Sequence, residues 1–264
     1  MASSGAPARS SWSGKWAFIL AAAASAVGLG NMWRFPYLAA QYGGGTFLLT
    51  YLVLVFTFGV SLLLLETALG RKTGQSAIGA FRTFGKKYAF IGVLAATVPF
   101  IITPYYCIIG GWVTKYTAAY LINGPAALAD DGGFFTGFIT SNTESFLWML
   151  LFMAIVFIVV SLGVKGGIEK ANLIMMPALI IMAVCIAIYT MTMPGALDGV
   201  LYYLVPDFSK FSPELVIGAL GQMFYSLSLA MGIMITYGSY LDKKSSLTQS
   251  VTRIGGFDIG VSFL

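Results

Sequence analysis

The segment ASAVGLGNMWRFP at Ala24–Pro36 lies inside the first long apolar run of the chain. Two glycines, an asparagine and an arginine are unfavourable in an unbroken helix that faces lipid, because glycine weakens a helix and a charge in mid-membrane is costly. Such a segment is tolerated where the helix is interrupted and its freed backbone groups line a cavity. The alternative interpretation is close helix packing through small residues.

The rest of the chain is as apolar as this segment. Of its 264 residues, 58% are hydrophobic and 9% are charged, whereas a soluble domain carries roughly 25% charged residues. The apolar runs show no two-residue alternation, so strands of a membrane barrel are not expected. The composition therefore predicts an all-α polytopic membrane protein. The chain has no histidine and no visible nucleophile–base pair, which argues against an enzyme.

Six apolar runs are long enough to cross a bilayer, which takes ~20 residues per helix. A seventh begins near Ser250 and reaches Leu264, so we expect an N-terminal fragment that is truncated in the seventh span. Both cysteines lie in these runs and are expected to be buried apolar side chains. The six runs are Trp16–Ala39, Thr46–Gly70, Tyr88–Ile122, Ser145–Gly163, Ile168–Met193 and Pro213–Tyr240.

The basic residues mark one side of the membrane. Acidic residues dominate the opposite loops, where Lys210 is the one basic residue. The positive-inside rule then predicts a cytoplasmic N-terminus in a cell inner (plasma) membrane. Because the charges are scattered over short loops, no nucleic-acid partner is expected. The basic residues on the predicted inner side are Arg9, Lys15, Arg71, Lys72, Arg82, Lys86, Lys87, Lys165, Lys170, Lys243, Lys244 and Arg253.

The sixth run contains a second polar interruption, GQMFYSLSLAMG at Gly221–Gly232. A serine in a membrane helix often only bonds its own preceding turn. Paired interrupted segments five spans apart, however, are typical of inverted-repeat transporters. We expect a single membrane domain, 1–264, with 1–15 as cytoplasmic N-terminus, 16–193 as the first five-helix repeat and 213–264 as the incomplete start of the second. Free helix N-termini suit a carboxylate, and unwound carbonyls and hydroxyls suit Na⁺.

Four stretches carry a resemblance to a known family: SAVGLGNMWRFPY, YGGGTF at Tyr42–Phe47, GRKTGQSAIGAF at Gly70–Phe81, and GQMFYSLSLAMG. In order and spacing they resemble the neurotransmitter:sodium symporter family, which includes bacterial amino-acid transporters. The resemblance implies a leucine-transporter-like fold with interrupted first and sixth helices. It also implies symport of Na⁺, as two ions, with a neutral, hydrophobic amino acid.

The resemblance also implies roles for single residues. The first sodium would meet the Ala26 carbonyl, Asn31, Ser226 and Asp258, and the second the carbonyls of Ala24 and Val27. The substrate carboxylate would meet the Leu29 and Gly30 amides and the Tyr106 hydroxyl. Substrate-binding positions are Ser25, Ala26, Gly28, Leu29, Gly30, Ile102, Tyr106, Tyr225, Ser226, Ser228, Ala230 and Met231.

Further positions resemble the family's gates and its chloride site. Arg9 and Trp12 resemble an inner latch and Arg34 an outer gate. Glu66 would bond backbone freed by the break in span six, and Gly167 with Pro177 would let span five unwind. Tyr51, Gln222, Ser226 and Ser262 match chloride-site positions. Asp258 resembles a sodium ligand that is usually asparagine, and its extra negative charge implies that chloride is not required.

Other interpretations of the same residues stay open. They are an ion channel or an amino-acid-sensing membrane protein on the same helices, or an inactive truncated product. A channel needs a continuous polar pore, whereas the polar residues here cluster at one depth. The oligomeric state is not predicted.

Overall fold

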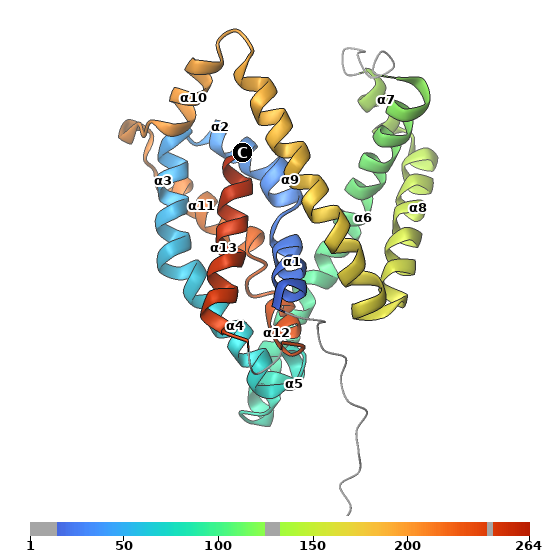
Figure 1. The fold of residues 1–264 in the computed structure, drawn as a ribbon, viewed down its shortest axis with the longest axis vertical. Helices are drawn as coiled ribbons and strands as arrows, with labels where there is room; N and C mark the ends of the chain where they lie inside the picture. Colours follow the sequence, from blue (N-terminus) through green and yellow to red (C-terminus); the bar gives the residue numbers. More distant parts are fainter. Residues whose placement is uncertain (1–14, 125–132, 242–244) are drawn as a thin grey trace, which may run out of the picture. The chain divides into compact units, whose positions relative to one another are not determined.

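The computed structural model describes residues 15–124, 133–241 and 245–264 (Figure 1). The chain forms two compact units, one of residues 1–96 with 169–264 and one of residues 97–168. In the described ranges every regular element is helical, with one isolated bridge between Gly44 and Pro206. The predicted all-α class is therefore confirmed. The prediction of a single domain stays a prediction.

The first predicted span is interrupted. It consists of α1 (Lys15–Ala26), the short π-helical turn η1 (Gly30–Arg34) and α2 (Phe35–Gln41). The second is a continuous helix built from α3 (Gly45–Leu54), η2 (Val55–Gly59) and α4 (Val60–Thr73), which ends at Gly74 with φ 64°. Glycine suits that end because the left-handed conformation carries no Cβ penalty there.

The loop after α4 carries Arg82, Lys86 and Lys87 and is called the basic loop below. The loop contains α5 (Ala77–Arg82) and η3 (Lys86–Tyr88), and it leads into α6 (Ala89–Asn123), which continues into the second unit. The elements after residue 169 are α9 (Lys170–Met191), α10 (Ala196–Leu204), η6 (Phe208–Lys210), α11 (Pro213–Ser226), α12 (Ile233–Gly238) and α13 (Leu247–Phe263).

The sixth predicted span is divided as well. Its two helices, α11 and α12, are separated by residues 227–232, which form turns and bends. α12 packs closely on α4 because two glycines remove side chains from the contact. A Cβ on Gly70 would overlap the Ile235 carbonyl oxygen, and a Cβ on Gly238 would overlap Thr67. Small residues at membrane helix contacts allow this close approach of two backbones.

The second unit contains the rest of α6, α7 (Gly133–Thr140), α8 (Asn142–Ser161) and η5 (Val164–Glu169), whose last residue is counted with the first unit. Lys115 of α6 forms an ion pair with Glu144 of α8. The same ammonium group lies 5.6 Å from the centre of the Trp148 ring. This pairing joins the two longest helices of the unit.

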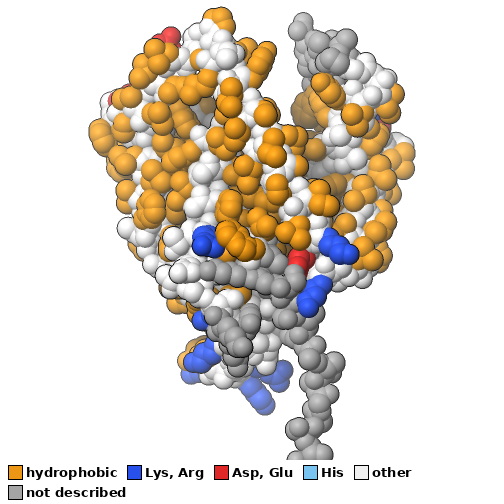
Figure 2. All heavy atoms as spheres, viewed as in Figure 1, with side chains coloured by type: hydrophobic (Ala, Val, Ile, Leu, Met, Phe, Trp, Pro, Cys, Tyr) orange, Lys and Arg blue, Asp and Glu red, His pale blue; other side chains and the backbone are white. Residues whose placement is uncertain are grey.

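Five helical stretches of the described residues are long and apolar enough to cross a membrane. They match the first five predicted spans, and hydrophobic side chains cover most of the visible helix surface (Figure 2). The chain is therefore a multi-pass membrane protein. One detail was predicted wrongly: Cys107 is buried, but Cys185 is exposed. An apolar side chain can face lipid as readily as a protein core, so an apolar run does not predict which. The five stretches are Phe18–Gln41, Gly45–Thr73, Lys86–Asn123, Asn142–Ser161 and Val164–Met191.

Candidate functional site

The first break follows α1. The helical ladder ends where the Val27 N–H donates to the Ala23 carbonyl oxygen (2.6 Å), and it restarts where the Met32 N–H donates to the Gly28 carbonyl oxygen (3.0 Å). Asn31 Oδ1 accepts from the Gly28 N–H at 3.2 Å. A Cβ built on Gly28 would meet no heavy atom of the described residues within 4 Å. Backbone groups thus lie beside open space at this break.

The second break has a different backbone. Ser228 and Ala230 adopt left-handed φ values of 53° and 59°, and Gly232 follows with 69°. Left-handed backbone is unfavourable for residues with a side chain, and it persists only where the surroundings hold it. Here Glu66 of α4 accepts a hydrogen bond from the Ala230 N–H at 2.7 Å. The second carboxylate oxygen of Glu66 is buried without a hydrogen-bond partner in the described part of the chain.

Three side chains join the two breaks directly. Ser228 Oγ donates to the Ser25 carbonyl oxygen at 3.0 Å. Gln222 Nε2 donates to the Gly30 carbonyl oxygen at 2.9 Å, while Gln222 Oε1 accepts from Arg34 at 3.0 Å. Carbonyl oxygens on the two sides of the first break thus accept hydrogen bonds from Gln222, which leads into the second break, and from Ser228, which belongs to it. Unpaired backbone groups in a membrane protein are costly, so these bonds stabilise both interruptions.

A buried carboxylate lies where the two breaks meet. Asp258 of α13 is fully buried. Its Oδ1 accepts hydrogen bonds from Ser226 Oγ and from Asn31 Nδ2 (2.9 Å), and its Oδ2 accepts from the Tyr51 hydroxyl at 2.7 Å. Asn31 Nδ2 also lies 2.6 Å from Ser262 Oγ. The result is a cluster of hard oxygen atoms around one carboxylate, a donor set that suits a small cation.

The sequence predicted this grouping only in part. Asn31, Ser226 and Asp258 were assigned to sodium, and Tyr51 and Ser262 were assigned to chloride-site positions. The structure places all five side chains in one hydrogen-bonded cluster. Tyr51 therefore bonds the carboxylate itself, at the position where the resemblance implies an anion.

The sequence missed two residues that support this cluster. The Phe35 ring packs edge-on against the Tyr51 ring, with 5.0 Å between centroids, and against Phe47 at 5.4 Å. The Tyr203 hydroxyl of α10 donates to the Ser262 carbonyl oxygen at 3.1 Å. The one-turn spacing of Phe47 and Tyr51 was a usable signal for the aromatic group. No signal pointed to Tyr203, which comes from a short helix far away in the sequence.

Tyr225 lies against both Arg34 and Gly30. The Arg34 guanidinium is 5.4 Å from the centre of the Tyr225 ring, which is within cation–π range. A Cβ on Gly30 would lie 3.0 Å from Tyr225 Cδ1. A glycine at position 30 therefore lets the Tyr225 ring approach the backbone of the first break.

The other predicted site residues lie in several parts of the chain. Val27 belongs to a buried cluster with Met176 of α9 and Val261 of α13, and Ala24 packs against that cluster. Ala26 is buried, Leu29 and Met231 are half-buried, and Ala230 is exposed. Ile102, Tyr106 and Gly167 belong to the second unit, and Pro177 lies inside α9. Arg9 and Trp12 lie outside the described residues.

A family model described as the sodium:neurotransmitter symporter family matches residues 9–124 and 139–264. The structure is also similar to the crystal structure of MhsT in complex with L-phenylalanine. The two chains are 38% identical with a TM-score of 0.90, and the match covers 96% of this chain and 59% of that one. This likeness confirms the leucine-transporter-like fold with interrupted first and sixth helices.

Curated relatives agree with this match. An uncharacterised sodium-dependent transporter of Methanocaldococcus jannaschii is 38% identical, over 97% of this chain and 54% of the relative. The uncharacterised sodium-dependent transporter YhdH of Bacillus subtilis is 35% identical, over 96% and 57%. The human sodium- and chloride-dependent transporter XTRP3 is 30% identical, over 88% and 44%. The chain thus spans about half the length of these relatives. On this evidence, the chain belongs to the sodium:neurotransmitter symporter family.

Proposed function

We propose that the protein is a sodium-coupled symporter of a neutral, hydrophobic amino acid and that it works by alternating access. The observation that carries this proposal is the buried Asp258 carboxylate, which accepts hydrogen bonds from Asn31 of the first broken span and Ser226 of the sixth. A charge held between two interrupted helices is the kind of site at which a coupling ion binds in secondary transporters.

The first sodium ion would bind at this carboxylate. Asp258, Asn31, Ser226 and the Ala26 carbonyl would supply its oxygen ligands. The side-chain amide and hydroxyl that now donate to Asp258 would reorient to present oxygen to the ion. A second sodium would use the carbonyls of Ala24 and Val27. Support comes from the hard oxygen ligands that these groups supply and from the match to a family of sodium symporters.

The substrate would bind beside the first break. Its carboxylate would meet the Leu29 and Gly30 amides and the Tyr106 hydroxyl, because free N–H groups at a helix start attract anions. The open space beside Gly28 leaves room for the substrate backbone, and Ser25 and Ser228 would contact it. The side-chain pocket would be lined by Ile102, Tyr225, Ala230 and Met231. These mostly apolar walls favour a neutral hydrophobic amino acid, and MhsT was solved with L-phenylalanine.

Transport would not require chloride. The negative charge of Asp258 lies beside Tyr51 and Ser226, two of the four positions that resemble a chloride site. A fixed carboxylate there would balance the charge of the bound cation without an added anion. The wild-type protein should therefore transport equally well in chloride and gluconate. The variant Asp258→Asn should become chloride-dependent, and equal uptake by this variant in both anions would contradict the proposal.

The basic loops would face the cytoplasm of a cell whose inner (plasma) membrane holds the protein. Each sodium that enters then gains roughly 2.3 kcal/mol per 100 mV of membrane potential, so two ions drive steep accumulation. Arg34, bonded to Gln222 and lying over Tyr225, would belong to the outer gate. Glu66 would hold the second break. Arg9 and Trp12 would close the inner side, and Gly167 with Pro177 would let span five open.

Uptake by cells that carry the full-length gene tests this proposal. Labelled phenylalanine or leucine should accumulate in sodium medium and not in choline medium, whereas glutamate and lysine should compete poorly. Equal uptake in choline would overturn the sodium coupling. Electrical recording separates the alternatives, because a symporter gives small saturable currents that need both substrates. Large currents without amino acid would favour a channel, and saturable binding without uptake would favour a sensor.

A further inference from the structure

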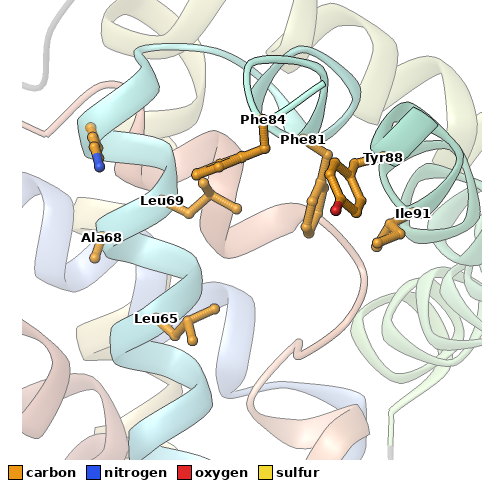
Figure 3. A pocket seen from close by; sticks show the side chains of 8 residues that line it. Leu65, Ala68, Leu69, Phe81, Phe84, Tyr88 and Ile91 are labelled. Atoms are coloured by element: carbon orange, nitrogen blue, oxygen red, sulfur yellow. The ribbon is translucent and has the colours of Figure 1, made fainter. Parts of the chain in front are cut away.

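An open apolar pocket of about 720 Å³ lies in the first unit between α4 and the segment from α5 to the start of α6, and none of its lining residues belongs to either break (Figure 3). One wall is a single face of α4, and the other is made of aromatic and aliphatic side chains from the basic loop. Phe84 and Ile91 in the second wall are 56% and 37% exposed, so the pocket is open to the surroundings. Its lining residues are Leu65, Ala68, Leu69, Lys72, Phe81, Phe84, Tyr88 and Ile91.

The α4 wall of the pocket changes from apolar to basic along the helix. Leu65, Ala68, Leu69 and Lys72 follow helical spacing, so they share one face of the helix. At 1.5 Å per residue, the face extends about 10 Å from Leu65 to Lys72. Lys72 stands in the last turn of a membrane-spanning stretch that ends at Thr73. The pocket is therefore apolar along the last turns of the span and cationic where the helix leaves the membrane.

The surroundings of Lys72 are strongly basic. Residues 67–129 contain no aspartate or glutamate. Lys72, Arg82, Lys86 and Lys87 form no ion pair with any described carboxylate, and Lys87 lies 5.1 Å from the centre of the Tyr88 ring. Lys and Arg side chains gather around α5 and the nearby end of α4 (Figure 2). Basic side chains that lack acidic partners favour the binding of an anionic ligand.

We propose that this pocket binds an anionic phospholipid. One acyl chain would lie along the α4 face between Leu65 and Leu69, opposite Phe84. The phosphate would be held by Lys72 with Lys86 and Lys87. A lipid is the occupant that matches both halves of the pocket, since it brings an apolar chain and a negative headgroup at the membrane boundary. The chain's own residues 1–14 are less suited, because their only charged side chain is Arg9. This site is independent of the proposed transport function.

Photocrosslinking of the purified full chain tests the site. Phosphatidylglycerol with a diazirine in its acyl chain should label residues within 65–91, severalfold more than phosphatidylcholine with the same group. Each lysine near a headgroup contributes to anionic selectivity by about fivefold. The variant Lys72→Gln/Lys86→Gln/Lys87→Gln should therefore lower the preference for phosphatidylglycerol by at least about fivefold. The matched control Lys165→Gln/Lys170→Gln changes basic residues outside the pocket and should keep the preference.

A second variant tests the apolar half without changing charge. Ala68→Trp fills the pocket, so labelling of residues 65–91 by either lipid should fall severalfold. Native mass spectrometry should then show loss of retained phosphatidylglycerol. Equal labelling by the two lipids in the wild type would overturn the proposal. So would crosslinks that map mainly outside residues 65–91, an equal effect of the control variant, or a crosslink that shows residues 1–14 in the pocket.

Discussion

The two interrupted spans differ in the backbone conformation of their breaks and in the residues that hold them. In the first, Gly28 leaves open space, no residue with a side chain adopts a left-handed φ, and carbonyl oxygens of the break accept bonds from Gln222 and Ser228. In the second, Ser228 and Ala230 are left-handed, and the α4 carboxylate of Glu66 holds an amide of the break. The first break contains no left-handed residue with a side chain, whereas the second contains two and is held by a carboxylate from a neighbouring helix. The second should therefore be the more sensitive to loss of a partner.

Removal of the Glu66 side chain should have the largest effect on stability. Glu66→Ala leaves the Ala230 amide without its carboxylate acceptor, and because bonds to charged groups are the stronger ones we expect a loss of about 3 kcal/mol in the free energy of unfolding. Glu66→Gln keeps an oxygen that can accept the same bond and should lose less. Thermal unfolding of the purified protein measures both. If the two variants unfold at the wild-type temperature, the second break does not depend on α4.

Loss of Gln222 should have the next largest effect, and it tests the first break. Gln222→Ala removes the donor to the Gly30 carbonyl oxygen and the acceptor for Arg34, at about 1 kcal/mol for each bond. Gln222→Glu loses the donor to Gly30 and replaces the hydrogen bond from Arg34 by an ion pair, so a loss as large as that of Gln222→Ala would assign the effect to the Gly30 bond. The same unfolding measurement applies. A larger loss for Gln222→Ala than for Glu66→Ala would reverse the proposed order of the two breaks.

Substitutions between glycine and alanine in the two breaks should have smaller effects. The one in the second break should change stability, and the one in the first should change amino-acid binding. Ala230→Gly relieves a left-handed residue and should stabilise the protein by about 1 kcal/mol. Gly28→Ala meets open space and should leave stability nearly unchanged, while it weakens amino-acid binding because its methyl group occupies the proposed substrate space. Unfolding temperature and binding of labelled phenylalanine report the two effects separately. Destabilisation by Ala230→Gly would contradict the strained backbone of the second break.

A change outside both breaks should have the smallest effect. The Ser209 hydroxyl and amide donate to Asp207 before α11 and lower its pKa. A lowered pKa stabilises the fold above the ordinary carboxyl value, and this contribution is lost as the pH falls through the lowered pKa. Asp207→Asn should thus be slightly destabilised at neutral pH, and the difference should disappear in strong acid. A difference that grows on acidification would contradict this sign.

The sequence predicted the elements better than the contacts. The spans, the two interruptions and the family resemblance follow from apolar length, polar residues inside apolar runs and four motifs. Tyr51 and Asp258 were recognised as chloride-site and sodium positions, but their direct hydrogen bond depends on how α3 packs against α13. Tyr203 and the exposure of Cys185 were missed for a related reason. In lipid the outer helix faces are as apolar as the core, so composition does not say which face packs inward.

Binding of labelled ²²Na⁺ to the purified protein tests the central claim most directly, namely that the two breaks form a cation site around Asp258. The wild type should bind ²²Na⁺ saturably, and unlabelled sodium should displace it while choline should not. Asp258→Ala should lose the ion at the first site and keep only binding at the second, and Glu144→Ala, which changes an acidic residue in the other unit, should leave both intact. Unchanged sodium binding by Asp258→Ala, or none by the wild type, would contradict the account.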